Sequence, residues 1–169
     1  MSDLIRIRLE DMRRFATDLV SRLGVAPRRA ASLAAHLLWF DAAGASTFGI
    51  ATLPRWLERI DGPEFDLATE GKVMTERNGT AMLDGENGLP PLVLERVAGL
   101  AVGKAREAGI GLVRVAHLGP TGSAAVLAAE MAIGPMAAVI VGPGPSWSLA
   151  MPSAQGLPAV FDSTLAGSE

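Results

Sequence analysis

The 169-residue sequence contains no cysteine and only two histidines, His36 and His117. Without cysteine, the chain can form no disulfide, no thiolate nucleophile and no cysteine-ligated zinc or iron–sulfur centre. The two histidines are widely separated along the chain, which argues against a histidine-based metal site. The sequence therefore predicts no metal site, and the lack of cysteine fits a cytoplasmic protein.

Clusters of basic residues and long apolar runs are absent as well. The chain has 15 Lys and Arg against 18 Asp and Glu, and its formal net charge is −3. Such a chain offers no electrostatic footprint for nucleic-acid phosphates or for an anionic membrane. No apolar run reaches the ~20 residues of a membrane helix, and acid and arginine occur too early in residues 1–12 for a signal peptide. We expect a soluble, unprocessed protein with no nucleic-acid or membrane partner.

What the sequence does contain is the composition of a folded protein, with 49% hydrophobic and 20% charged residues. In the N-terminal third, apolar residues recur at helical spacing, and Gly24 and Pro27 provide an end signal and a start signal. The pattern predicts three helices, over residues 9–23, 27–40 and 50–60.

The pattern changes after residue 62. Asn78-Gly79 separates two short strand-like segments and favours a hairpin with a type I′ turn. The order of strand, helix and strand within residues 110–141 predicts at least one parallel pair with a right-handed crossover. The expected elements are strands 72–77 and 80–83, a helix from Pro90 to Gly109, strand 110–116, helix 123–132, and strands 136–141 and 159–162.

No internal repeat and no long linker divides the chain. A chain of this length suits one domain with a substantial core. We therefore predict a single α/β domain over residues 1–169, with a helical N-terminal layer at 1–62 and a mixed sheet with β-α-β crossovers at 63–169.

Three separated segments resemble motifs of the type-2 malate/L-lactate dehydrogenase family. Residues 41–56, D-A-A-G-A-S-T-F-G-I-A-T-L-P-R-W, are similar to the family's D-x-R-G-x-x-S-H-G-x-x-R-L-P-R-Y. Residues 84–89, D-G-E-N-G-L, are similar to D-G-D-N-G-L-G, and residues 115–122, V-A-H-L-G-P-T-G, to S-N-H-F-G-x-x-G. The resemblance covers about residues 9–162. It implies the N-terminal half of a fold whose members use NAD(H) or NADP(H) on small 2-hydroxy, 2-oxo or imino acids.

The first motif departs from the family pattern at its chemical positions. In the family, its Ser, His and second Arg line the substrate pocket, where imidazole exchanges a proton and guanidinium holds a carboxylate. The corresponding residues here are Thr47, Phe48 and Thr52, and the preceding arginine is Ala43. Because phenylalanine transfers no proton and threonine holds no carboxylate as arginine does, the resemblance implies a substrate pocket remnant. Arg55 is retained from the family's L-P-R-Y and suits a helix surface.

Further differences concern the regions that shape the family's substrate and nicotinamide sites. The family's T-N-T-S-P corresponds to residues 141–145, V-G-P-G-P, which read as a rigid turn rather than a nucleotide fingerprint. A G-T-N-P segment is missing near Trp147, and about half of a typical family chain is absent. The resemblance thus predicts a truncated relative, or one subunit of a divided protein.

His117 is the strongest candidate for chemistry, because it matches the family's N-H-F-G histidine and follows a strand of an α/β fold. It is either an acid/base or a histidine that only stabilises the fold. The loop after it opens a helix, where free N–H groups can receive a phosphate or carboxylate, or where a hydroxyl serves only as N-cap. These cofactor or anion candidates are Gly119, Thr121, Gly122 and Ser123.

Two hypotheses follow. The first is a catalytically degenerate subunit or scaffold that requires no cofactor and assembles with itself or with a second subunit supplying the missing sheet and site. The second is an enzyme that acts on a small 2-oxo, 2-hydroxy or imino acid, with His117 as acid/base and Thr47 and Thr52 binding this carboxylic acid. That enzyme would be either an NAD- or NADP-dependent oxidoreductase or a cofactor-free proton-transfer enzyme or lyase. The first hypothesis explains several losses at once and is favoured.

Overall fold

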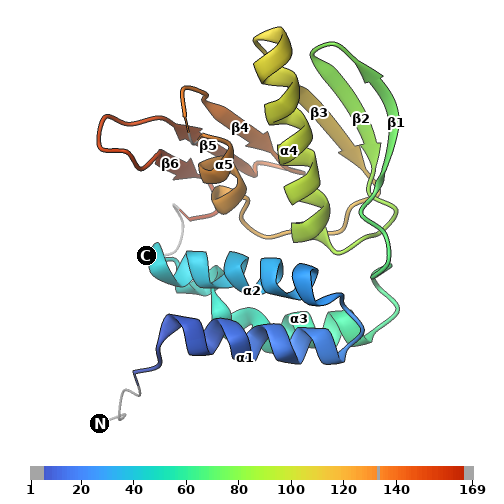
Figure 1. The fold of residues 1–169 in the computed structure, drawn as a ribbon, viewed down its shortest axis with the longest axis vertical. Coiled ribbons are helices and arrows are strands. Elements are labelled where there is room, and N and C mark those ends of the chain that lie inside the picture. The colour runs from blue at the N-terminus through green and yellow to red at the C-terminus, as the bar shows by residue number, and fades with distance from the viewer. Residues whose placement is uncertain (1–5, 133, 166–169) are drawn as a thin grey trace. The chain divides into compact units, whose positions relative to one another are not determined.

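The computed structural model describes residues 6–132 and 134–165. The chain forms two compact units, Met1–Leu67 and Ala68–Glu169 (Figure 1). The division falls close to the predicted change of pattern at residue 62, and the grouping of both units into one domain stays a prediction. Within the described residues, no helix is long and apolar enough to cross a membrane.

The first unit is helical, as predicted. Its helices are α1 (Leu9–Arg22), α2 (Pro27–Ala42) and α3 (Leu53–Asp61), and α1 packs along α2. The third helix begins later than predicted, because two short 3-10 turns, η1 (Ser46–Phe48) and η2 (Ile50–Thr52), precede it. The core of this unit consists of apolar side chains from all three helices, including Ala16, Val20, Leu33, Leu37, Phe40, Trp56 and Ile60.

The second unit begins with a three-stranded sheet. Its strands are β1 (Lys72–Arg77), β2 (Thr80–Asp84) and β3 (Leu112–Ala116), in the order β1-β2-β3. The β1–β2 pair is antiparallel, whereas β2 and β3 are parallel and are joined by α4 (Pro90–Ala108), which packs on both. Prolines begin α4 and Gly109, at φ 80°, ends it, as the sequence predicts.

The hairpin at Asn78-Gly79 is confirmed, but the predicted type I′ turn is wrong. That turn requires positive φ at both central residues, and neither has it. The glycine serves a different purpose, because a Cβ at Gly79 would lie 3.0 Å from the carbonyl oxygen of Ile110. The Gly79 carbonyl in turn accepts a hydrogen bond from the N–H of Leu112 at 2.8 Å, which fixes the start of β3 beside β2.

A second sheet follows, with strands β4 (Ala138–Val141), β5 (Trp147–Met151) and β6 (Ala159–Asp162). All of its pairings are antiparallel, and α5 (Ala125–Met131) packs on one face. The sequence did not predict β5, whereas the turn at residues 142–145 is confirmed by a hydrogen bond from the N–H of Gly142 to Ser146. The core between helix and sheet consists of Ala128, Ala132 and Ala150, with Ile140 and Val160 packed against them.

The α/β class and the mixed strand directions are confirmed, but the predicted parallel neighbours within residues 110–141 are wrong. The strands β3 and β4 belong to different sheets, and the parallel pair is β2–β3. When a helix connects two strands, the second strand usually runs in the same direction as the first. This rule does not decide whether another strand lies between the two.

The two sheets differ on the face that lies away from their helices. In the first sheet, Ala81 and Leu83 are buried. The opposite face is mostly polar, with Lys72, Thr75, Arg77, Thr80, Asp84 and Arg114, and it also carries the apolar side chains of Met82, Leu112 and Ala116. In the second sheet, Ala138, Ser148 and Ala150 are buried. Their opposite face, here named the apolar face, consists of Val139, Val141, Trp147, Leu149, Met151 and Phe161.

Candidate functional site

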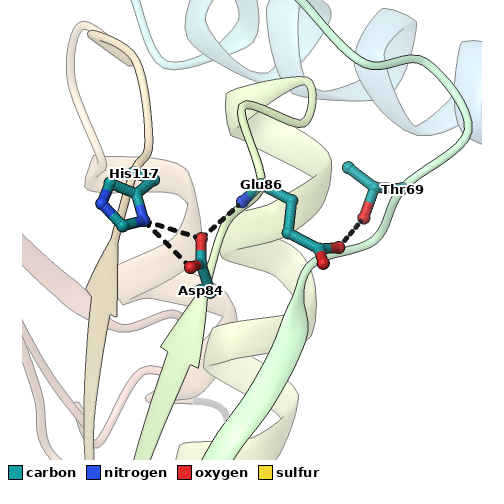
Figure 2. A network of polar contacts seen from close by, with 4 residues as sticks. All are labelled: Thr69, Asp84, Glu86 and His117. Carbon is teal, nitrogen blue, oxygen red and sulfur yellow. Dashed lines mark hydrogen bonds and ion pairs between the residues drawn. The ribbon is translucent and has the colours of Figure 1, made fainter.

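An aspartate and a histidine meet at the carboxyl ends of two neighbouring parallel strands. Asp84 is the last residue of β2, and His117 directly follows β3. Because Asp84 pairs in register with Ala116, the two side chains emerge at the same edge of the sheet. The His117 Nδ1 lies 2.9 and 3.0 Å from the two carboxylate oxygens of Asp84 (Figure 2). The carboxyl ends of parallel strands are where α/β folds usually bind ligands.

Backbone hydrogen bonds hold this pair in place. The Glu86 N–H donates to the Asp84 carboxylate at 2.9 Å, and the Asn87 N–H donates to the His117 carbonyl at 3.0 Å. Glu86, Asn87 and His117 all have positive φ, between 48° and 53°. This left-handed conformation is uncommon for residues other than glycine and persists only where the surroundings enforce it. Hydrogen bonds therefore hold the loop after β2 against the loop after β3.

The electrostatics of the pair favour an oriented imidazole. The Glu86 N–H, and then His117, lower the pKa of the Asp84 carboxyl below its usual value. Asp84 is therefore a carboxylate at neutral pH that holds the imidazole through Nδ1. The His117 side chain is 69% exposed, and Figure 2 shows its other ring nitrogen pointing away from Asp84. This arrangement can deliver or accept a proton at Nε2.

Asp84 is a candidate site residue that the sequence analysis did not single out. The D-G-E-N-G-L motif contains it, but only the parallel pairing of β2 with β3 brings it to His117. Its neighbour Glu86 accepts a hydrogen bond from the Thr69 hydroxyl at 2.5 Å (Figure 2). The signal in the sequence was that both residues directly follow predicted strands.

The loop proposed for anions has internal contacts of its own. The Ser123 hydroxyl is buried, donates to Asp162 at 2.9 Å and accepts from the N–H of Ala125 at 3.2 Å. Thr121 contacts the carbonyl of Gly122 at 3.3 Å, and Gly119 lies in the same irregular segment. These contacts explain Ser123 as an anchor for α5, a helix of seven residues. Anion or cofactor binding by this loop stays a prediction.

Asp162 forms a buried polar cluster at the end of β6. It accepts hydrogen bonds from the hydroxyls of Ser123, Ser148 and Thr164 and from the N–H of Thr164. Burial raises the pKa of the Asp162 carboxyl, but the hydrogen bonds from Ser148, Thr164 and Ser123 outweigh this effect and keep the pKa below its ordinary value. The cluster ties α5 and β5 to β6 and explains why this aspartate tolerates burial.

The loop that resembles a substrate pocket lies in the first unit. Asp41 accepts a hydrogen bond from the Ile50 N–H at 2.7 Å, and a Cβ at Gly49 would lie 2.2 Å from an Asp41 oxygen. The Thr52 hydroxyl donates to the Gly49 carbonyl at 2.7 Å. The polar atoms of Asp41 and Thr52 thus stabilise the 3-10 turns of the loop itself.

Phe48 and its neighbours complete this loop. The Phe48 ring is partly buried, and its centroid lies 5.7 Å from that of Phe40 on α2. Thr47 and Arg55 are exposed. His36, one turn before Phe40, has a ring-to-ring distance of 6.4 Å to Phe40, and burial lowers its pKa to about 4. The described contacts give Phe48 and His36 packing roles. They join Thr47, Phe48, Thr52 and Arg55 within the first unit, whereas Asp84 and His117 lie in the second.

Within residues 6–132 and 134–165, no group of three or more His, Cys, Asp or Glu side chains is placed to hold a metal ion. The candidate features described above are the Asp84–His117 pair and the loop at residues 41–52.

Comparison with known proteins places these features in a family. The family model for malate/L-lactate dehydrogenase matches residues 7–161. A malate dehydrogenase from Pyrococcus abyssi is 31% identical over 129 residues, covering 75% of this chain and 36% of that protein. The structure of malate dehydrogenase from Pyrococcus horikoshii aligns with a TM-score of 0.87 and 25% identity, covering 97% of this chain and 51% of the other.

A sulfolactate dehydrogenase from Methanocaldococcus jannaschii shares the fold, with a TM-score of 0.82, 20% identity, and coverage of 95% of this chain and 51% of the other. The chain thus spans about a third to a half of the length of these relatives. The match extends over both compact units and includes the Asp84–His117 pair and the loop at residues 41–52. The chain belongs to the malate/L-lactate dehydrogenase family.

Proposed function

We propose that this chain is a catalytically degenerate subunit of an oligomeric, cytoplasmic assembly built on the malate/L-lactate dehydrogenase fold. The observation that carries the proposal is the apolar face of the second sheet. Val141 is 75% exposed, Val139 62% and Phe161 52%. An apolar surface of this kind supports an interface with another polypeptide, because it favours association over contact with water.

The loop at residues 41–52 supports the catalytic part of the proposal. Where the resemblance implies histidine and arginine in the substrate pocket, this chain has Phe48 packed on Phe40 and Thr52 bonded to the Gly49 carbonyl. A phenyl ring transfers no proton, and a single hydroxyl does not replace the bidentate grip of guanidinium on a carboxylate. The subunit therefore requires neither NAD nor NADP for its role.

Two measurements test this function. Native mass spectrometry of the complex recovered from source cells through the tagged chain should show a fixed stoichiometry above one copy. The 169-residue chain alone should give no NAD(P)H oxidation with small 2-oxo acids. A chain that is monomeric in the cell extract and oxidises NAD(P)H with such an acid would contradict the proposal.

The Asp84–His117 pair favours a second candidate, an enzyme that uses His117 as acid/base on a small 2-oxo, 2-hydroxy or imino acid. Relatives named malate dehydrogenase and L-sulfolactate dehydrogenase act on acids of this size. The reaction would be an NAD(P)-dependent reduction or a cofactor-free proton transfer. His117→Ala should then lower kcat by about 100-fold or more, and Asp84→Asn by about tenfold through the orientation of the ring.

A matched control separates the two candidates. Arg77→Gln changes an exposed side chain on β1 and should leave any turnover unchanged. If the assembly has an activity that His117→Ala does not affect, this chain contributes no acid/base and acts only as a subunit.

A further inference from the structure

The sequence contains two asparagines, Asn78 and Asn87, and a glycine follows each of them. An asparagine side-chain amide is open to attack by the backbone nitrogen of the next residue, and glycine leaves that nitrogen unshielded because it has no side chain. Both asparagine side chains are exposed to solvent. The two dipeptides therefore have the same chemistry, and only the surrounding structure distinguishes them.

The Asn87-Gly88 dipeptide is held in one conformation. The Gly88 N–H donates a hydrogen bond to the Gly85 carbonyl at 2.7 Å, and the Asn87 N–H donates to the His117 carbonyl at 3.0 Å. Gly88 is buried, and a Cβ there would lie 2.8 Å from the Val93 side chain. The Gly88 nitrogen can therefore turn toward the Asn87 side chain only if this loop opens and loses its hydrogen bonds.

The Asn78-Gly79 dipeptide lies at the tip of the hairpin between β1 and β2 (Figure 1). Its anchor to the rest of the sheet is the Gly79 carbonyl, which accepts from the Leu112 N–H. Within residues 6–132 and 134–165, the Gly79 N–H donates no hydrogen bond. The attacking nitrogen at this site is therefore available without loss of a backbone hydrogen bond.

A buried lysine favours the reactive form of the same peptide group. The Lys104 Nζ lies 2.7 Å from the Arg77 carbonyl and 3.4 Å from the Asn78 carbonyl. The Asn78 carbonyl and the Gly79 N–H belong to one peptide group, so the negative charge that forms when this nitrogen loses its proton spreads to the carbonyl oxygen. A nearby ammonium group stabilises that charge, although the Glu76 carboxylate, 2.9 Å from Nζ, offsets part of the effect.

We propose that Asn78 is a site of spontaneous deamidation, whereas the fold protects Asn87. The deprotonated Gly79 nitrogen forms a bond to Cγ of Asn78, the Cγ–Nδ2 bond breaks, and the amide group takes up a proton and leaves as ammonia. Water then opens the resulting cyclic imide at one of its two carbonyls and gives aspartate or isoaspartate. The reaction consumes one water, releases one ammonia and requires no oxidant or reductant.

The modification changes the hairpin that contains it. Isoaspartate adds one carbon to the backbone between Arg77 and Thr80, which face each other in register across the hairpin. The added atom displaces the Gly79 carbonyl from the Leu112 N–H, the contact that fixes the start of β3. In the separated isoaspartate form, the Leu112 amide should exchange about tenfold faster, while the amides of β5 and β6 exchange as before.

Peptide mass spectrometry of the folded chain tests the proposal. Cleavage after Arg77 and Arg96 places both asparagines on one peptide, residues 78–96, and its fragment ions distinguish the two sites. During incubation in mildly alkaline buffer, deamidation at Asn78 should be at least about tenfold faster than at Asn87, because Asn87 reacts only after local opening. In urea, where neither loop is folded, the two rates should agree within about twofold.

Two matched variants assign the signal. Asn78→Gln should remove the product at residue 78, because glutamine closes a larger ring much more slowly, and should leave the rate at Asn87 unchanged. Asn87→Gln should leave the rate at Asn78 unchanged. Equal rates at the two asparagines in the folded chain, or faster reaction at Asn87, would overturn the inference. The inference does not depend on the proposed assembly role, since the comparison is made within one chain.

Discussion

Each of the two three-stranded sheets of the second unit packs one face against a helix. Their open faces differ in polarity. The first sheet presents polar side chains such as Lys72, Thr75 and Arg114, which water can solvate. The second presents Val141, Phe161 and the rest of the apolar face. Water can therefore solvate most of the open face of the first sheet, whereas burial of the apolar face of the second sheet is expected to be favourable.

The two sheets also differ in the buried charge that stabilises them. In the first, the buried Lys104 Nζ donates to the Arg77 carbonyl at 2.7 Å and lies 2.9 Å from the Glu76 carboxylate. In the second, the buried Asp162 receives hydroxyl and backbone donors. A cation thus stabilises the hairpin of the first sheet, and an anion stabilises the second sheet against α5.

The largest effect is expected from making the apolar face as polar as the other. The double substitution Val141→Lys and Phe161→Lys should weaken assembly about 100-fold or more, since burying unpaired charge costs several kcal/mol. Thr75→Lys, on the polar face, should change it less than about twofold. Native mass spectrometry over a dilution series measures both. Equal effects at the two faces would show that the apolar face is not an interface.

Asp162→Ala should destabilise the second sheet by about 2–4 kcal/mol, because several buried donors lose a charged acceptor. Urea unfolding followed by amide exchange in β5 and β6 measures the change. Thr121→Ala, which alters a nearby hydroxyl without a contact to Asp162 in the described structure, is the control. A loss equal to that of the control would contradict the role of the cluster.

Lys104→Met should cost less, about 1–2 kcal/mol. It keeps the buried stem while removing the hydrogen bonds to the Arg77 and Asn78 carbonyls. The protection of amides in β1 and β2 should fall, while that in β5 should not. Loss of protection in both sheets would contradict the independent stabilisation of the two.

Acid should affect the second sheet through Asp162. Its folded pKa lies below the ordinary value of 3.8, so its stabilising contribution is complete above about pH 4 and is lost as the pH falls through the folded pKa. At neutral pH the Asp162 carboxylate stays ionised, so small changes in pH do not alter its contribution to the free energy of unfolding. Asp162→Asn should remove this acid dependence, measured as the pH profile of unfolding free energy. An unchanged profile would assign the dependence to other carboxyls.

The sequence predicted those features that depend on local chemistry. Pro27, Pro90 and Gly109 mark helix ends, and the structure confirms each. The adjacency of strands was not predictable, because the order of elements does not reveal whether β3 and β4 are neighbours. The same limit hid Asp84, which reaches His117 only through the β2–β3 pairing.

Within the first unit, the residue types of the loop at residues 41–52 predicted a substrate pocket remnant, since phenylalanine and threonine lack the chemistry of histidine and arginine. The sequence did not show that Asp41 and Thr52 would be bonded to their own backbone. Those contacts depend on the two 3-10 turns, whose short hydrogen-bonded rings leave no periodic signal in the sequence.

Hydroxyl-radical footprinting of the assembly from source cells tests the contrast between the two sheets most directly. Met74 on β1 is 53% exposed and Met151 on the apolar face is 41% exposed, so each sheet has a reporter of the same chemistry. We predict that assembly protects Met151 from oxidation relative to the chain alone and leaves Met74 as reactive as before. Oxidation of Met151 at the same rate in the assembly and in the chain alone would contradict the account.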